Sequence, residues 1–120
     1  MCIRDRLPAV TRSLKLQKRA AKEGFDWKKP EDTLKKVKEE LNELTFEMKH
    51  NNKKKIREEL GDLLFSCINL SRKLGIDTET VIRESNRKFE KRFKKMEKKM
   101  NKKSLKWELK NLEKEWQNSK

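Results

Sequence analysis

The sequence predicts an all-α fold, a bundle of about five helices. Three observations support this. The 120 residues contain only 3 Gly and 2 Pro, so signals that break helices are few. Long stretches are rich in Lys, Glu and Leu, which have high helix propensity. Apolar residues recur at alternating spacings of three and four, which places them along one face of a helix.

The first two helices are expected over residues 8–21 and 30–48. Gly24 follows the first helix and is a natural stop, because glycine adopts a positive φ without steric cost. Pro30 suits the first turn of the second helix, and the two acidic residues after it suit the positive end of the helix dipole. Between the helices we expect a turn with two packed aromatic side chains, Gly24-Phe25-Asp26-Trp27.

Three further helices are expected over residues 54–73, 78–100 and 104–116. Residues 50–52 form the turn before the first of these, and Gly75 ends it. Asp or Thr just before the next helix supplies its cap. The last helix carries apolar side chains at helical spacing, namely Leu105, Leu109, Leu112 and Trp116.

The formal net charge is +14, from 34 Lys and Arg against 20 Asp and Glu. Such a field attracts polyanions, whether nucleotides or nucleic acids. Much of the excess is lysine on solvated helix faces, so nucleic acid is the less favoured partner. No apolar run approaches the ~18 residues needed to cross a membrane, and no segment has the continuous apolar centre of a signal peptide. We therefore expect no membrane association.

Hydrophobic residues make up 32% of the chain and charged residues 45%. That is too little apolar surface for a thick closed core, so we expect a homodimer to complete it. Residues 1–6 fit no element, and we expect this leader not to be native. Residues 7–120 are expected to form one domain. Cys67 lies within an apolar pattern and is expected to be a buried, reduced thiol of a cytoplasmic protein.

The second and third expected helices each carry an apolar seam for helix packing. A short turn joins them, which makes antiparallel packing the default. The seam residues are Leu34, Val37, Leu41, Leu44 and Met48 on one helix, and Ile56, Leu60, Leu63, Cys67, Leu70 and Leu74 on the other.

The same two helices carry carboxylates in matched positions. Glu40 lies at the edge of one seam with Glu43 further round, and Glu59 and Asp62 repeat the arrangement on the other. Antiparallel packing would bring all four together, where they repel one another unless they are protonated or bind a hard cation. Oxygen ligands without His or Cys favour magnesium, with manganese as the second candidate. The alternative is that these acids are solvated or paired with lysines.

The acidic residues follow a spaced pattern: two Glu, two spacers and a third Glu, then later Glu, two spacers and Asp. It reads Glu39-Glu40-Leu41-Asn42-Glu43 and Glu59-Leu60-Gly61-Asp62. In this pattern the chain resembles the MazG family of nucleoside triphosphate pyrophosphohydrolases, and is most similar to the C-terminal catalytic half of two-domain MazG proteins. The similarity covers residues 7–116 and includes Gln17-Lys18-Arg19-Ala20-Ala21, Gly24-Phe25-Asp26-Trp27, Gly61-Asp62-Leu63-Leu64-Phe65, Asn69-Leu70 and Asn86-Arg87-Lys88-Phe89-Glu90-Lys91-Arg92-Phe93.

The resemblance implies a helical dimer that uses Mg²⁺ to hydrolyse a nucleoside triphosphate to the monophosphate and pyrophosphate. By the same resemblance the metal ligands are Glu40, Glu43, Glu59 and Asp62. The spacing before Trp116 departs from the family pattern. An N-terminal MazG-like domain is not part of the sequence, so we expect a single-domain relative or a fragment. The residues that match nucleotide-contacting segments are Lys36, Lys55, Glu58, Asp62, Lys88, Arg92 and Trp116.

Several roles stay open at this point. Glu39 is the candidate general base, and its alternative role is a solvated surface acid. Trp27, Trp107 and Trp116 either stack on a base or pack within the protein. The rival classes of protein are a basic helical nucleic-acid-binding protein, a non-catalytic assembly module, and a related all-helical nucleotide hydrolase specific for dUTP or a similar pyrimidine substrate. The preferred base and sugar and the biological role are not determined by the sequence.

Overall fold

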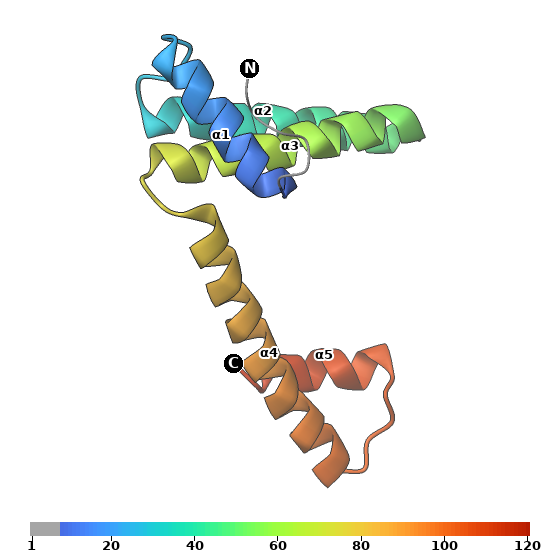
Figure 1. Ribbon diagram of the computed structural model, residues 1–120. Helices are drawn as coiled ribbons and strands as arrows, with labels where there is room; N and C mark the ends of the chain where they lie inside the picture. The colour runs from blue at the N-terminus through green and yellow to red at the C-terminus, as the bar shows by residue number, and fades with distance from the viewer. Residues whose placement is uncertain (1–7) are drawn as a thin grey trace. The chain divides into compact units, whose positions relative to one another are not determined.

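The computed structural model describes residues 8–120, and the leader expected at residues 1–6 lies outside them. The described chain is all-α, as predicted (Figure 1). It divides into two compact units, one ending at Thr78 and the other spanning Glu79–Lys120. No helix of the described chain has the length and apolar content to span a membrane. The helices are α1 (Ala9–Lys22), α2 (Pro30–Lys49), α3 (Lys53–Lys73), α4 (Thr78–Lys102) and α5 (Leu109–Gln117).

The first four helices end in the same backbone motif. The second residue after each of these helices adopts a positive φ. The N–H of the residue that follows it donates to a carbonyl five positions earlier. This arrangement satisfies carbonyls that the helix end leaves without partners. The predicted stops at Gly24 and Gly75 and the predicted turn at residues 50–52 are therefore confirmed. The residues with positive φ are Gly24, Asn51, Gly75 and Ser104.

The last helix differs from the prediction of residues 104–116, because α5 begins only at Leu109. Ser104 has a φ of 51° and terminates α4 instead of starting a new helix. The N–H of Leu105 donates to the carbonyl of Met100 over 3.1 Å, which closes the end of α4. Ser is common at helix starts, so its use here as a left-handed stop could not be read from the residue type.

The starts of α2 and α3 follow local chemistry. Pro30 stands in the first turn of α2 with Glu31 and Asp32 beside it, as predicted. The side chain of Asn52 accepts a hydrogen bond from the backbone N–H of Lys55 over 3.2 Å and caps α3. The turn predicted at residues 50–52 thus also fixes where α3 begins.

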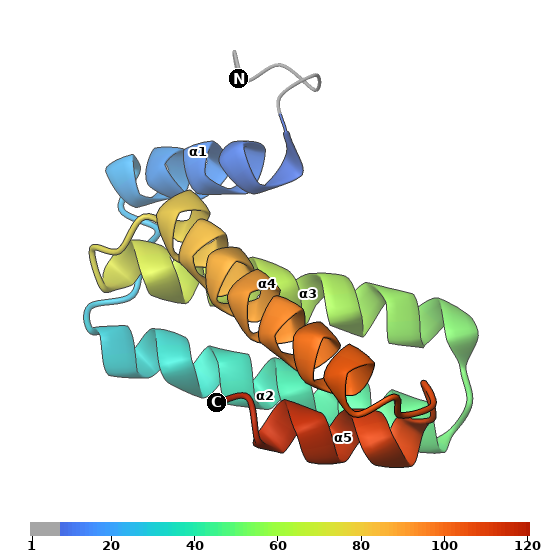
Figure 2. The same cartoon turned by 90° about the horizontal axis from the view of Figure 1, so that it is seen from below.

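In the first unit, α2 and α3 lie side by side, and α1 packs on α3 (Figure 2). The predicted seams split into two columns that each repeat every seven residues. One column is half-buried between the helices, comprising Val37, Leu44, Ile56, Leu63 and Leu70. The other column is exposed, comprising Leu34, Leu41, Met48, Leu60, Cys67 and Leu74.

Cys67 belongs to the exposed column and is a free thiol. The expectation that it is buried is therefore wrong for this chain, although it is unpaired as expected. The reason is geometric: an antiparallel pair covers only one side of each apolar stripe, and Cys67 lies on the side that α2 does not reach.

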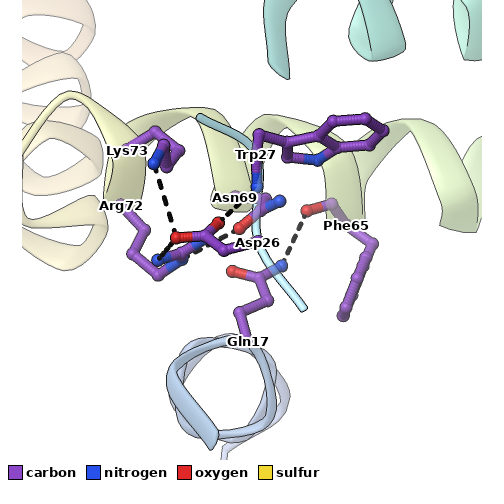
Figure 3. A network of polar contacts seen from close by, with 7 residues as sticks. All are labelled: Gln17, Asp26, Trp27, Phe65, Asn69, Arg72 and Lys73. Atoms are coloured by element: carbon purple, nitrogen blue, oxygen red, sulfur yellow. Dashed lines mark hydrogen bonds and ion pairs between the residues drawn. The ribbon is translucent and has the colours of Figure 1, made fainter. Parts of the chain in front are cut away.

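The connection between α1 and α2 is held against the end of α3 (Figure 3). Asp26 accepts hydrogen bonds from Arg72 over 2.5 Å and from Lys73 over 3.4 Å. Its carboxylate also accepts the backbone N–H of Trp27 over 2.8 Å. The Arg72 guanidinium is the main cause that holds the pKa of Asp26 below its usual range. Because these partners are 46 and 47 residues away from Asp26, they fix the tertiary position of the connection.

In the second unit, Arg92 of α4 and Lys103, the residue that follows α4, bind the C-terminal part of α5. The Arg92 guanidinium donates to the carbonyl of Trp116 over 3.0 and 2.6 Å and lies 3.8 Å from the centre of its ring. Lys103 pairs with the buried Glu115 at 2.7 Å. Positive side chains are favourable here because the C-terminal carbonyls of a helix carry partial negative charge. The apolar centre of this unit contains Met96 and Met100.

Candidate active site

Three of the four predicted metal ligands gather between α2 and α3. One carboxylate oxygen from each of Glu40, Glu43 and Glu59 lies within 4.8 Å of the others. We refer to these three residues as the acidic cluster. The side chain of Glu40 is buried, Glu59 is half-buried and Glu43 is exposed. Asp62 is exposed one turn after Glu59 and is not part of the cluster. The antiparallel arrangement thus brings together acids that are up to 19 positions apart in the sequence.

Lys36 offsets the negative charge of the buried Glu40 side chain. Its Nζ lies 3.0 Å from Oε1 of Glu40. The hydrogen bond from Lys36 lowers the pKa of Glu40, although burial alone would raise it. The same contact raises the pKa of Lys36. Glu40 is therefore ionised at neutral pH while only 5% exposed.

Glu59 behaves in the opposite way. Its hydrogen bond with Glu43, its burial and the negative charges of Glu43 and Glu40 raise its pKa to about 7. Near neutral pH, Glu59 is therefore partly protonated when no cation offsets the surrounding negative charge. Either a proton or a bound cation would offset the negative charge of the acidic cluster, so cation binding is expected to compete with protonation of Glu59.

The acidic cluster fits a divalent cation on its own chemistry. Oε2 of Glu40 and Oε2 of Glu59 are both buried without a hydrogen-bond partner. Leaving a buried carboxylate oxygen unpaired is costly, and a bound cation would lower that cost. The donors are oxygens only, which is the set that Mg²⁺ and Mn²⁺ prefer over zinc.

The remaining predicted residues of the first unit lie outside this cluster. Glu39 is exposed and pairs with Lys36 at 3.4 Å. Lys55 and Glu58 form an exposed ion pair of 3.6 Å in the first turns of α3. These contacts are local, at spacings of three residues, and leave both cations accessible to a ligand.

The predicted residues of the second unit gather on α4 and α5. Lys88 and Arg92 line a basic cleft of about 570 Å³ together with Lys91, Lys95, Ser119 and Lys120. Trp116 packs on Phe89 with their ring centres 5.1 Å apart. Trp107 lies 6.2 Å from Phe93 in the same way, so both tryptophans contact other aromatic side chains. The contact between Arg92 and Trp116 was not apparent from the sequence, because the two are 24 residues apart.

Comparison with known proteins decides the family. The family model for the MazG nucleotide pyrophosphohydrolase domain matches residues 28–97. The chain belongs to the MazG family. The match includes the whole acidic cluster and the part of α4 that carries Lys88 and Arg92.

Two curated relatives are similar to the chain. A protein of Thermotoga maritima, named nucleoside triphosphate pyrophosphohydrolase/pyrophosphatase MazG, is 40% identical over 83 residues, which are 69% of this chain and 31% of the relative. A protein of Escherichia coli strain K12, named nucleoside triphosphate pyrophosphohydrolase, is 39% identical over 87 residues, which are 71% of this chain and 33% of the relative. The chain therefore spans about a third of the length of these relatives.

Proposed function

We propose that this chain hydrolyses nucleoside triphosphates to the monophosphate and pyrophosphate, and that the reaction depends on Mg²⁺. The observation that carries the proposal is the acidic cluster, with two unpartnered buried oxygens, in a chain of the MazG family. Both curated relatives are named for this activity. Because Mn²⁺ prefers similar oxygen ligands, it is the second candidate cation.

The acidic cluster would hold the cation through Glu40, Glu43 and Glu59, and we propose Asp62 as the fourth ligand. A bound cation would offset phosphate charge and lower the pKa of a coordinated water. Lys36 keeps Glu40 ionised and ready to bind. Protonated Glu59 would lose its proton when a cation binds, because a positive charge favours the ionised carboxylate. Cation binding is therefore expected to release a proton near neutral pH.

The nucleotide would be held by the cations that the resemblance identified. We propose that Lys55, Lys88 and Arg92 bind the phosphates, Arg bidentately and Lys as a point charge. Glu39 is accessible and is proposed as the general base that accepts a proton from the attacking water. The further nucleotide contacts that we propose are Lys36, Glu58, Asp62 and Trp116.

The test is pyrophosphate release from a panel of ribo- and deoxyribonucleoside triphosphates, with Mg²⁺ and with a chelator. We expect Mg²⁺-dependent release with an equal amount of the monophosphate. Release of inorganic phosphate and a diphosphate would contradict attack at the α-phosphorus. If folded protein in Mg²⁺ turns over no triphosphate, the proposed activity is wrong. Salt-dependent nucleic-acid binding would then be measured for the rival function. A cytoplasmic location stays a prediction.

We also propose that the chain is a homodimer that covers the exposed column of the α2–α3 pair. Six apolar or thiol side chains of that column face solvent, and Leu64 and Phe65 beside it are 56% and 44% exposed. A contiguous apolar surface of this kind is typical of an interface rather than of a monomer's surface. A second copy carries the same column, so a two-fold contact would bury both at once.

Light scattering of the purified chain tests the dimer. We expect a mass twice that of the chain for the wild type, and a monomer or a strongly weakened dimer for the double variant Leu34→Gln and Leu41→Gln. The control is Val10→Gln, an exposed aliphatic residue on α1 outside the column. A monomeric wild type at high concentration would contradict the proposal.

A further inference from the structure

The first unit contains a cavity away from the acidic cluster. Its volume is about 250 Å³, below the ~300 Å³ at which pockets for drug-sized ligands begin. The walls come from α1, the α1–α2 connection and α3. The size suits one planar ring system rather than a whole nucleotide.

Two aromatic side chains stand at this cavity with much of their surface in solvent. Phe25 is 83% exposed and Trp27 is 42% exposed, so the predicted packing of these two rings in the turn is wrong, and both line the cavity. Exposed aromatic faces are costly in water but favourable when a flat ring stacks on them. The ion pairs of Asp26 with Arg72 and Lys73 hold the segment that carries both rings (Figure 3). The backbone of the segment that carries both rings is therefore held against α3.

The polar walls have a fixed hydrogen-bonding direction. Gln17 is 5% exposed and its Nε2 donates to the carbonyl of Phe65 over 3.0 Å. Because a carbonyl accepts only from an N–H, Oε1 of Gln17 must be the other amide atom, and it is buried without a partner. Oδ1 of Asn69 is likewise fixed, since it accepts from Nε of Arg72 over 2.9 Å. Both residues line the cavity, Gln17 has an unused acceptor, and Asn69 has an amide donor, Nδ2.

The cavity lies along α3 from the acidic cluster. Glu59, Ser66 and Asn69 lie on one flank of α3, at spacings of seven and three residues. At 1.5 Å per residue, Phe65 is ~9 Å and Asn69 ~15 Å along the axis from Glu59. A phosphate chain at the cluster and a base at the cavity are separated by about the length of a nucleoside monophosphate.

We propose that this cavity binds the base of the substrate, with Phe25 and Trp27 stacking on the ring and Gln17 and Asn69 hydrogen-bonding its edge. This inference rests on the proposed function. An acceptor and a donor lining one cavity can pair with a base edge that presents an amino or imide N–H together with a ring nitrogen or keto oxygen. Gln17 and Asn69 are therefore specificity-determining residues, and the phosphates are held elsewhere.

The test compares nucleoside triphosphates with ribose 5′-triphosphate, which has no base. Phe25→Ala and Gln17→Met should each lower kcat/KM for the preferred triphosphate by about tenfold or more, the first because base stacking is lost and the second because a hydrogen bond to the base edge is lost. Both variants should leave turnover of ribose 5′-triphosphate unchanged and reduce the ratio between the best and worst bases. Phe46→Ala, which removes another exposed phenylalanine of the same unit, should change neither quantity. Equal losses on both substrates, or an unchanged ratio between bases, would overturn the inference.

A binding experiment separates this inference from the proposed function. Free nucleosides, which lack phosphates, are titrated into the wild type in a chelator while NMR follows the side-chain amides of Gln17 and Asn69 and the indole of Trp27. We expect these signals to shift with the preferred nucleoside and not with ribose. Active enzyme without such shifts would overturn the base site alone. Shifts without turnover of any triphosphate would overturn the proposed hydrolysis and leave the base site supported.

Discussion

Glu59→Gln should reduce Mg²⁺-dependent turnover by at least about 100-fold and at the same time stabilise the metal-free protein. Loss of a residue that merely orients a metal ligand typically costs 10- to 100-fold, so loss of a proposed ligand should cost at least the upper value. The stability gain follows from the pKa of Glu59, which the neighbouring Glu43 and Glu40 raise from 4.5 to about 7.

The raised pKa of Glu59 determines how the stability of the metal-free protein changes with pH. A carboxyl with a raised folded-state pKa stabilises the fold below the unfolded pKa, near 4.5, and this contribution is lost as the pH rises through about 7. The metal-free wild type should therefore melt at a lower temperature at about pH 8 than at about pH 6. Glu59→Gln carries no charge there and should remove this part of the dependence.

Thermal unfolding in a chelator at both pH values, followed by addition of Mg²⁺, measures these effects. Mg²⁺ should raise the melting temperature of the wild type at the higher pH and have little effect on Glu59→Gln. Glu47→Gln is the matched control, because Glu47 lies one turn beyond Glu43 on α2 and outside the acidic cluster. Full turnover by Glu59→Gln would contradict the metal-site assignment. A melting temperature of Glu59→Gln that depends on pH as the wild type does would contradict the raised pKa of Glu59.

Asp62→Ala should also reduce turnover by about 100-fold or more, while the helical content stays unchanged. The sequence predicts Asp62 as the fourth metal ligand, and the folded chain leaves its side chain exposed one turn from Glu59. An exposed acid contributes little to stability, so a large loss of activity with an unchanged melting temperature would identify a functional role.

Glu40→Ala is the companion variant for that measurement. Glu40 is buried and paired with Lys36, so its loss should affect both turnover and stability. Glu40→Gln keeps the shape of the side chain and distinguishes lost metal binding from lost packing. Turnover is measured by pyrophosphate release, and helicity by circular dichroism. Wild-type activity in Asp62→Ala would restrict the metal site to the three clustered glutamates.

The sequence by itself determined the helices, most of their ends and the family. Gly24 and Gly75 were predictable as helix stops because glycine accepts a positive φ, a property of the residue and its neighbours alone. The matched spacing of the carboxylates was also readable, since the geometry of a helix fixes which residues share a side. Membership of the MazG family follows from the same local patterns and was confirmed by the comparisons.

The tertiary structure decided which of these surfaces meet. Leu44 is half-buried and Leu41 is exposed, although both follow the same apolar pattern. The difference depends on the angle at which α3 packs against α2. The raised pKa of Glu59 depends on how close Glu43 and Glu40 of the neighbouring helix lie to it. The cavity at Gln17 depends on ion pairs of Asp26 with residues near the end of α3. Each of these is set by long-range packing, which acts between residues that no local spacing relates.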